Sequence, residues 1–400
     1  MNGNIVTYVS RMAEVPLANI LAGTKVGVLL GARQVGKSTL VDHVMRSNKT
    51  LTLNFDVETD KLRFLAASKM TPKDAWVSLG QPEILILDEA QRLPETARIV
   101  KGWHDVRLPV RIILLGSSSL ELLSHAAESL TGRNEKLILP PLLFQEALQA
   151  QAWYAGTLSR EVLLQTFTDP LHVFLMERMA FGSYPEVVVT PARKPLLRNL
   201  AADYLWKDIL QTGLVKTPES IKRLLMLLAH QVGSVVSTNE LATQLQLARP
   251  TVERYIDLLE QCFVIFRLSS FSTHPRKEIS KSKKIFFWDT GIRNALLNQF
   301  STDEYRPDIG RLWENWVIAE IAKCNLLQGG ACELFFWRSR HGSEVDLVVK
   351  GEDELRAFEI KWRRSRSRCR AFADAYGIEP VILSSENPFV SDLALADPHE

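Results

Sequence analysis

The chain has 400 residues, of which 46% are hydrophobic and 24% are charged, and its formal net charge is +2. This composition excludes a mainly disordered chain and allows two or three domains with cores of their own. No apolar stretch reaches the roughly 18 residues that a membrane-spanning helix needs, and the first residues lack the basic-then-apolar order of a secretory signal. We therefore expect no membrane contact and a cytoplasmic location.

The four cysteines, Cys262, Cys324, Cys332 and Cys369, show no C-x-x-C spacing. The sequence therefore indicates neither a zinc site nor a disulfide framework. We expect all four to be packing or surface residues.

A short apolar segment, KVGVLL, leads directly into a glycine loop, GARQVGKST, and then into a helical stretch, TLVDHVM. This order predicts a strand, a phosphate-binding loop and a helix. In such a loop the glycines let backbone N–H groups approach a phosphate, and the lysine contacts the β and γ oxygens. We expect ATP to bind at Gly31, Ala32, Arg33, Gln34, Val35, Gly36, Lys37, Ser38 and Thr39.

A second apolar segment, EILILDEAQ, ends in two neighbouring carboxylates, Asp88 and Glu89. Asp88 and the Ser38 hydroxyl suit the coordination shell of Mg²⁺, and Glu89 suits the polarisation of the attacking water. Acidic residues at a strand end also cap helices, but beside the glycine loop they predict an ATP-hydrolysing site with Lys37.

A third apolar segment, RIILLGSSS, ends in small hydroxyl residues. ATPases of this class place a polar group here, near the γ-phosphate, so Ser117 or Ser118 is the candidate. The same serines suit an ordinary turn, and the sequence leaves both interpretations open.

After a helical region, the stretch VVSTNELATQLQLARPTVERYIDLLEQCFVIFRLSSF predicts a helix, a turn, a second helix and a β-ribbon. This order is typical of a winged helix-turn-helix, with Thr238 as the cap of its first helix. The outward residues of the second helix, Thr251, Glu253 and Arg254, approach either a DNA groove or a protein partner.

The segment HPRKEISKSKK follows as the wing. Its density of positive charge suits sequence-independent contact with phosphates, and equally suits a solvated loop. The residues concerned are Arg276, Lys277, Lys281, Lys283 and Lys284.

Two further apolar strands, EVDLVV and AFEIKW, flank a polar turn and predict a hairpin. Asp346 on the first strand can meet Glu359 and Lys361 on the second, since side chains two apart share a face. Two carboxylates bind a divalent cation, and a lysine beside them can activate water for attack on a phosphodiester. Glu314, from the preceding helix, can complete the metal shell. The spacing of Asp346, Glu359 and Lys361 alone is a weak signal, because many surface hairpins contain it without a functional role.

The run KWRRSRSRCR, from Lys361 to Arg370, concentrates positive charge beside this hairpin. It suits neutralisation of a phosphate backbone, or a solvated face. Trp362 within the run either stacks on an exposed base or packs in the core.

In their order along the chain, these motifs resemble a prokaryotic family of AAA-plus-type ATPases. The resemblance covers about residues 26–364, and its carriers include GARQVGKSTL, LILDEAQRLP, LLGSSSLELL, ESLTGR, LPPLLFQEA, YLWKDI, KKIFFWDTG, GRLWENWV, EVDLVV and FEIKW. It implies an α/β fold with a P-loop ATPase domain, a winged helix and an α/β C-terminal domain like PD-(D/E)XK nucleases. We expect the ATPase domain at 1–155, a helical segment at 156–215, the winged helix at 216–290 and the nuclease-like domain at 291–400.

The resemblance also implies ring-type assembly, in which an arginine of one subunit completes the ATP site of its neighbour. Arg133, in SLTGR, is the candidate, because a guanidinium can stabilise charge on the γ-phosphate. It also suits a surface position after a glycine turn. The metal-binding positions of the family are occupied here by Asp346, Glu359 and Lys361, in a fold that either cuts DNA or only binds it.

The sequence therefore predicts a Mg²⁺-dependent, homo-oligomeric ATPase that binds and remodels DNA, with branched or Holliday-junction DNA as a candidate substrate. One alternative is a nucleotide-dependent switch that acts on a protein partner through a non-catalytic C-terminal scaffold. Such a switch turns over ATP slowly and without stimulation by DNA. A second alternative is a nuclease gated by ATP, which would lose DNA cutting when Asp346 or Glu359 is replaced by alanine.

Overall fold

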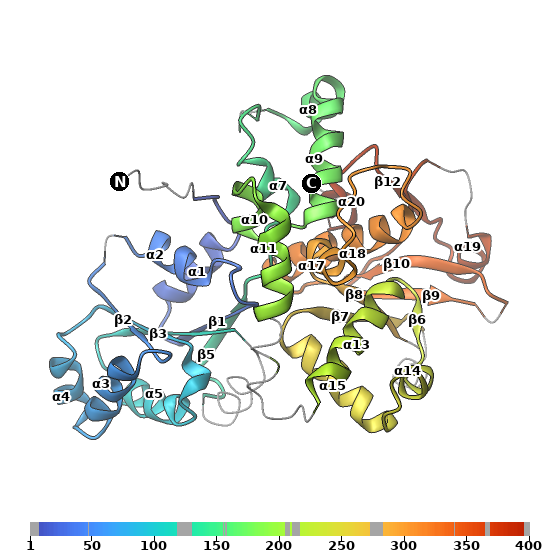
Figure 1. Cartoon of the computed structure of the whole chain (residues 1–400). Coiled ribbons are helices and arrows are strands. Elements are labelled where there is room, and N and C mark those ends of the chain that lie inside the picture. The colour runs from blue at the N-terminus through green and yellow to red at the C-terminus, as the bar shows by residue number, and fades with distance from the viewer. Residues whose placement is uncertain are drawn as a thin grey trace. The chain divides into compact units, whose positions relative to one another are not determined.

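Two separate sheets organise the chain, and the computed structural model in Figure 1 shows them in two units. The N-terminal unit consists of Ser10–Pro140 with Gln261–Phe263, and the C-terminal unit of Met1–Val9, Pro141–Glu260 and Val264–Glu400. The structure describes residues 8–46, 48–117, 130–154, 156, 158–204, 209, 217–272, 283–339, 341–364 and 369–395.

The N-terminal unit is built on a five-stranded parallel sheet with the order β2-β3-β4-β1-β5. Strands β1, β3 and β4 are rich in Val, Ile and Leu, as is usual for parallel strands that helices shield from water. This sheet confirms the α/β class. Its strands are β1 (Val26–Leu30), β2 (Thr50–Asn54), β3 (Ile84–Asp88), β4 (Arg111–Gly116) and β5 (Asn134–Ile138).

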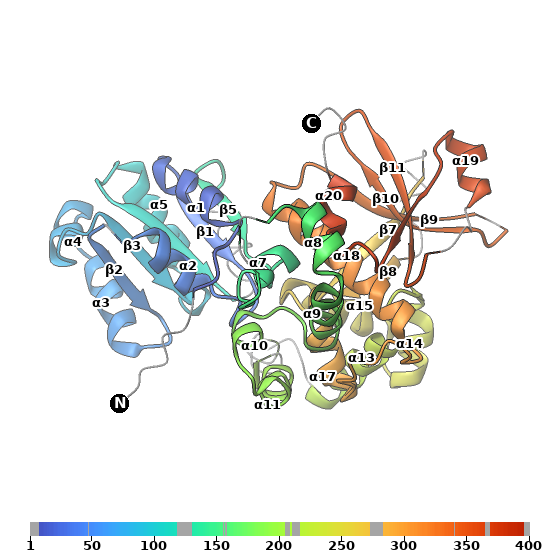
Figure 2. The same ribbon diagram turned by 90° about the horizontal axis from the view of Figure 1, so that it is seen from above.

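Helices pack around this sheet, as Figure 2 shows from above. The core contains an aromatic group in which Phe64 lies 5.2 Å from Phe55 and 5.4 Å from Trp103, between ring centroids. Burying each such ring contributes about 1.5–3 kcal/mol to stability. The helices are α1 (Glu14–Ala22), α2 (Lys37–Val44), α3 (Glu58–Ser68), α4 (Pro72–Ser78), the 3₁₀ helix η1 (Ala90–Arg92) and α5 (Thr96–Asp105).

The C-terminal unit is built on a seven-stranded mixed sheet with the order β12-β11-β10-β9-β7-β8-β6. Neighbouring strands are antiparallel, except that β7 pairs parallel with β9 and β11 with β12. The strands are β6 (Val235–Val236), β7 (Ile265–Ser270), β8 (Lys283–Phe287), β9 (Glu333–Arg338), β10 (Glu344–Lys350), β11 (Leu355–Lys361) and β12 (Val381–Ser384).

The long helix α18 contributes much of the core of this unit. Trp313 stacks on Trp316 at 5.2 Å and meets the edge of Trp362 at 5.8 Å, between ring centroids. Trp362 is 8% exposed, so it is a core residue and offers no free face to a base. The helices are α7 (Phe144–Leu148), α8 (Arg160–Thr166), α9 (Thr168–Phe181), α10 (Pro185–Val189), α11 (Arg193–Asn199), the π-helix η2 (Leu200–Tyr204), α13 (Pro218–His230), α14 (Thr238–Leu245), α15 (Arg249–Gln261), α17 (Thr290–Leu297), α18 (Ile309–Leu327), α19 (Arg370–Tyr376) and α20 (Val390–Leu395).

The elements after α13 follow the predicted order: β6, α14, α15, β7 and β8, with β8 antiparallel to both β6 and β7. The predicted cap of α14 was one residue off, because the hydroxyl of Ser237, not Thr238, accepts a hydrogen bond from Glu240 N. On α15, Arg254 is exposed, whereas Thr251 and Glu253 are half-buried.

One sheet joins the segments that the sequence assigned to two domains, 216–290 and 291–400. Ser269 and Ser270 of β7 pair with Phe335 and Phe336 of β9, and the amide of Phe271 continues the pairing by donating to Phe336 O at 2.6 Å. The two segments therefore share a continuous backbone hydrogen-bond network.

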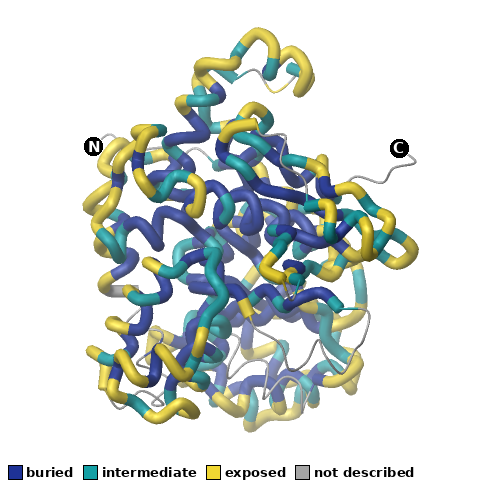
Figure 3. Tube along the Cα trace, turned by 90° about the vertical axis from the view of Figure 1, so that its right-hand side faces the viewer, coloured by how far each residue is buried: buried dark blue, intermediate teal, exposed yellow. Residues whose placement is uncertain are grey.

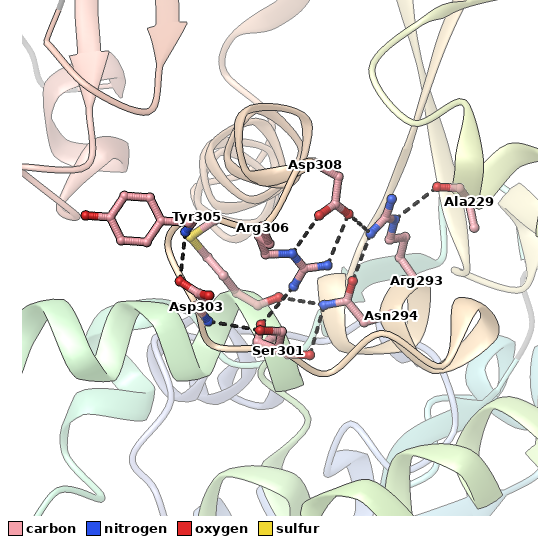
Figure 4. A network of polar contacts seen from close by, with 10 residues as sticks. Ala229, Arg293, Asn294, Ser301, Asp303, Tyr305, Arg306 and Asp308 are labelled. Carbon is pink, nitrogen blue, oxygen red and sulfur yellow. Dashed lines mark hydrogen bonds and ion pairs between the residues drawn. The ribbon is translucent and has the colours of Figure 1, made fainter.

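A polar network fixes the start of α18 (Figure 4). Arg293 and Arg306 donate to opposite oxygens of Asp308, each at 2.6 Å, and Arg293 also donates to Ala229 O of α13. Burial alone would raise the pKa of Asp308, but the hydrogen bonds from Arg306 and Arg293 outweigh it and lower that pKa. This charged network links α13, α17 and α18.

Buried residues follow the strands and the inner faces of the helices, drawn in dark blue in Figure 3. Cys262 and Cys324 are among them, whereas Cys332 and Cys369 are half-buried. Within the described ranges, none of the helices has the length and apolar character that crossing a membrane requires.

Candidate nucleotide site and carboxylate site

Three parallel strands end side by side at one edge of the N-terminal sheet. Strand β1 leads into Gly31, β3 ends at Asp88, and β4, which lies between them, is followed by Ser117. Open α/β sheets bind their ligands at the carboxyl ends of the strands. The sheet thus brings together the glycine loop, the acidic pair and the serine from distant parts of the sequence.

The loop has the backbone conformation of an anion-binding turn. Gly31 has a φ of +155°, and a Cβ there would lie 2.3 Å from Leu139 O, so only glycine fits. Gly36, the N-cap of α2, has a φ of +92°, and Gln34 has a φ of +60°. Positive φ values turn successive N–H groups towards one point, and the amino end of α2 adds its dipole there.

A buried arginine outside the motif, Arg11, holds this loop in place. It donates from NH1 to Val35 O at 2.9 Å and from NH2 to Pro140 O at 2.7 Å. No sequence pattern indicates this role, because both partners are backbone carbonyls, which every residue carries.

Lys37 is buried, and its Nζ donates to Gly31 O at 2.8 Å and to Ala32 O at 3.0 Å. Both acceptors are neutral backbone carbonyls, which orient the ammonium group within the loop. Ser38 Oγ donates to Asp88 Oδ2 at 3.2 Å, and Thr39 beside it is exposed. A serine hydroxyl and a carboxylate at this distance fit the oxygen shell that Mg²⁺ prefers.

Polar side chains surround Glu89, which itself has a φ of +52°. Gln91 Nε2 donates to Glu89 Oε2 at 2.5 Å, Ser117 Oγ donates to the same oxygen at 3.4 Å, and Arg33 NH2 lies 3.8 Å from it. These contacts fix the carboxylate that was predicted to polarise water. Gln91 lies in the quoted motif LILDEAQRLP, yet the sequence analysis did not single it out. Ser118 lies outside the described residues.

Arg133 lies at the other end of β1. Its carbonyl accepts a hydrogen bond from Val26 N, at the start of that strand, and the five residues of β1 separate it from the glycine loop by about 16 Å. Its Nε donates to Asp105 Oδ1 at 2.6 Å, which lowers the pKa of Asp105. Arg133 therefore does not reach the nucleotide loop of its own chain.

In the C-terminal unit, the predicted D…E-x-K residues converge. Lys361 Nζ lies 3.3 Å from Asp346 Oδ2 and 4.0 Å from Glu359 Oε2. Asp346 also accepts from Ile360 N at 2.8 Å, and Glu359 accepts from the Cys369 amide at 2.5 Å. Burial is the main cause that raises the pKa of Glu359.

Glu314 lies beside this group and contacts a lysine that the sequence placed elsewhere. Lys284 Nζ lies 2.9 Å from Glu314 Oε1 and 2.5 Å from Glu344 Oε1, and its side chain is 2% exposed. Lys284 is therefore not available to a phosphate backbone, contrary to the expectation for the wing. Burial, with smaller effects of Asp346 and Glu344, raises the pKa of Glu314 to about 7 against the opposing effect of Lys284.

Across the part of the chain that the structure describes, no group of three or more His, Cys, Asp and Glu side chains is placed to hold a metal ion. Of the other basic residues, Lys283, Arg363, Arg364 and Arg370 are exposed. Arg276, Lys277 and Lys281 of the wing, and residues 365–368 of the second basic run, lie outside the described residues.

Residues 23–148 match the family model of an AAA domain. Residues 174–303 and 309–386 match two domains of unknown function, DUF8612 and DUF4143. Uncharacterized proteins of Mycobacterium bovis and Mycobacterium tuberculosis are each 28% identical over 372 residues, which are 91% of this chain and 76% of the relative. An uncharacterized protein of Methanocaldococcus jannaschii is 26% identical over 349 residues, which cover 84% of this chain and 74% of the relative.

Among solved structures, the Walker-type ATPase PABY2304 of Pyrococcus abyssi has a TM-score of 0.50 at 16% identity, and the match covers 72% of this chain and 96% of that one. At this identity the likeness concerns the fold. The AAA match spans the glycine loop and both acidic residues of the nucleotide site. The chain thus carries an AAA-type P-loop domain, and the protein is an ATPase.

Proposed function

We propose that this ATPase acts on DNA as a homo-oligomer and uses MgATP to remodel the DNA or to move on it. In the nucleotide site, Lys37 contacts the γ-phosphate, Ser38 and Asp88 hold Mg²⁺, and Glu89 polarises the attacking water. Ser117 and Gln91 position Glu89. The loop residues from Gly31 to Thr39 supply the phosphate cradle.

The element order around α15 carries the proposal. A strand, two helices and a two-stranded ribbon, with the first strand at the ribbon's edge, is the order of a winged helix-turn-helix. Its second helix, α15, exposes Arg249 and Arg254, whereas Val252 and Ile256 face the core. Exposed arginines on this helix suit contact with phosphates and base edges.

The C-terminal strands extend this DNA-binding surface. We assign β9 to β12 with α18 to a PD-(D/E)XK-like domain, and the exposed Arg363, Arg364 and Arg370 beside it supply further phosphate contacts. Because β7 and β9 are paired, the helix-turn-helix segment and this domain hold DNA as one body. Branched or junction DNA, which offers more than one duplex arm, fits two such contact regions.

The position of Arg133 supports the proposal of an oligomer. An arginine finger must reach a γ-phosphate, and Arg133 lies at the sheet edge opposite its own nucleotide loop. A neighbouring copy therefore supplies the site that Arg133 completes, in a ring or a similar closed assembly.

One observation favours a second candidate, a nucleotide-dependent switch for a protein partner. On the exposed side of α15, Arg249 pairs with Glu253 at 2.8 Å, which removes part of the positive charge. Lys284 of the predicted wing is buried as well. A surface with balanced charge suits a protein partner better than a phosphate backbone.

The two candidates differ in how ATP hydrolysis responds to DNA. Turnover by the wild type and by Lys37→Ala is measured without DNA, with linear duplex and with a four-way junction. The proposal expects DNA to stimulate the wild type, most strongly as the junction, and to have no effect on Lys37→Ala. Turnover that is indifferent to every DNA would overturn the proposal and favour the protein switch.

A binding measurement tests the surface itself. Arg254→Ala should weaken DNA binding and reduce its dependence on salt concentration, because one phosphate contact is lost. Arg63→Ala, an exposed arginine on α3 of the N-terminal unit, is the matched control and should bind DNA as the wild type does. Equal binding by both variants would remove α15 from the interface.

A further inference from the structure

The position of Lys284 in the fold differs from what its sequence context predicts. This lysine follows a basic, wing-like segment, yet its side chain points into the C-terminal unit and is 2% exposed. Its Nζ lies 2.9 Å from Glu314 of α18 and 2.5 Å from Glu344 of β10. The neighbouring Lys283 is exposed, so the strand separates two adjacent lysines into one outer and one inner residue.

The space around Lys284 is closed. The Phe336 ring of β9 lies 5.5 Å from Nζ, and a Cβ added at Gly233 would lie 2.9 Å from Glu314 Oε2. A hydrated cation at Glu314 would therefore meet the backbone on one side and the lysine on the other. Glu314 and Glu344 both lie within hydrogen-bonding distance of the Lys284 ammonium and balance its charge.

The second lysine has a similar arrangement nearby. Lys361 Nζ lies 3.3 Å from Asp346 Oδ2 and 4.0 Å from Glu359 Oε2. Each lysine is thus shared by two carboxylates. Lys361 is the lysine that the D…E-x-K pattern places beside Asp346 and Glu359, but Lys284 is outside that pattern and holds the oxygens of Glu314 and Glu344 that a complete metal shell would need.

The resident metal that a PD-(D/E)XK-type fold implies does not fit these residues. We infer that the Lys284 ammonium takes the place of a divalent cation between Glu314 and Glu344, so that the carboxylate cluster is a metal-free, lysine-bridged centre. If the domain binds DNA as proposed above, it does so without a metal-activated water to cut it. The lysine-bridged cluster itself is tested without DNA.

Mn²⁺ is the probe, since carboxylates bind it well and it is paramagnetic. The full chain carries Asp88→Asn, which removes the carboxylate proposed for Mg²⁺ at the nucleotide site, and no nucleotide is added. Free Mn²⁺ is counted by electron paramagnetic resonance, and the melting temperature is measured with Mn²⁺ and with EDTA. We expect no bound Mn²⁺ and no shift in melting temperature.

Adding Lys284→Met, which keeps the length of the side chain and removes its charge, should create one Mn²⁺ site per chain and a Mn²⁺-dependent rise in melting temperature. A further Glu314→Gln should abolish this gain. Lys283→Met, one residue away and exposed, is the matched control and should gain nothing. A folded Lys284→Met protein that gains no Mn²⁺ overturns the inference.

If Lys284→Met does not fold, Mn²⁺ binding by the Asp88→Asn chain, in which Lys284 is retained, still tests the inference. Stoichiometric Mn²⁺ binding by the Asp88→Asn chain, weakened by Glu314→Gln, would show that Glu314 is a metal ligand and would overturn the inference. No binding before or after Glu314→Gln supports it.

Discussion

The nucleotide site and the carboxylate site each centre on a buried lysine, but the partners of the two lysines differ. Lys37 is 7% exposed and donates to two backbone carbonyls, whereas Lys284 is 2% exposed and lies between two carboxylates. The two carbonyls are neutral and orient the Lys37 ammonium in the loop that is predicted to bind phosphate. The two carboxylates beside Lys284 balance the charge of that lysine. The buried fraction of a lysine therefore does not indicate its role, whereas the charge of the groups that it contacts does.

The sites also differ in how much one chain supplies. The carboxylate site takes all its members from the C-terminal unit of a single chain. In the nucleotide site, by the function proposed above, Lys37 contacts the γ-phosphate and Arg133 of a second copy adds a further cation there, since Arg133 of the same chain lies at the other end of β1.

The largest effect should come from Arg133→Ala, which we expect to lower ATP turnover by about 10³-fold, as for other arginine fingers. Mixing Arg133→Ala with Lys37→Ala protein should restore part of the activity, because some sites then combine an intact loop with an intact arginine. Phosphate release measures each variant and the mixture. Arg107→Ala, an exposed arginine near the same sheet edge, is the control. A mixture no more active than its parts would show that the arginine is not shared.

A second prediction concerns the cost of removing a lysine from a buried carboxylate. Lys323 pairs with Glu320 at 2.7 Å, and both side chains are 3% exposed. Lys323→Met leaves the Glu320 charge buried without its ion pair, and should lower the free energy of unfolding by about 3–5 kcal/mol.

The control is Lys350→Met, which breaks an exposed pair with Glu333 and should cost less than about 1 kcal/mol. Urea unfolding followed by tryptophan fluorescence compares the two variants. Equal destabilisation would mean that burial of the carboxylate does not decide the effect.

The smallest effect is a pH dependence at the start of α18. The pKa of Asp308 is lowered in the folded state, so its contribution to stability is present above the unfolded pKa and is lost as the pH falls through the folded pKa. Asp308→Asn should be less stable than the wild type at pH 7, and the difference should shrink as the pH is lowered towards about 3. Melting temperatures across this pH range measure it, and a difference independent of pH would exclude the Asp308 charge as the cause.

The glycine loop and the strand ends beside it could be predicted from the sequence, because they depend on local backbone conformation and on apolar periodicity. The glycine pattern sets the positive φ values, and apolar strands that end in acidic residues all reach one edge of a parallel sheet. Arg11 and Gln91 were missed. Their roles depend on which groups the folded chain brings to them, and neither has a distinctive spacing in the sequence.

For the carboxylate site, the sequence indicated Asp346, Glu359, Lys361 and Glu314 as one group, but it did not indicate the contacts of Glu314 and Glu344 with Lys284. Asp346, Glu359 and Lys361 meet because a hairpin register brings them together, and such a register is visible in the sequence. Lys284 of β8 and Glu344 of β10 lie 60 residues apart in the sequence, and the successive pairings of β8 with β7, β7 with β9 and β9 with β10 bring their strands into one sheet. The basic segment HPRKEISKSKK does not indicate which of its lysines is buried in the folded protein.

By itself, the sequence determined the strand, loop and helix of the ATP site, the α/β class and the order of the elements around α15. These depend on neighbours within a few residues, through backbone conformation and apolar periodicity. Only the tertiary structure decided which charges are compensated, that Trp362 is a core residue, that Arg133 faces away from its own loop and that one sheet joins the two C-terminal segments. Those outcomes depend on contacts between distant elements, whose free energies local sequence does not encode.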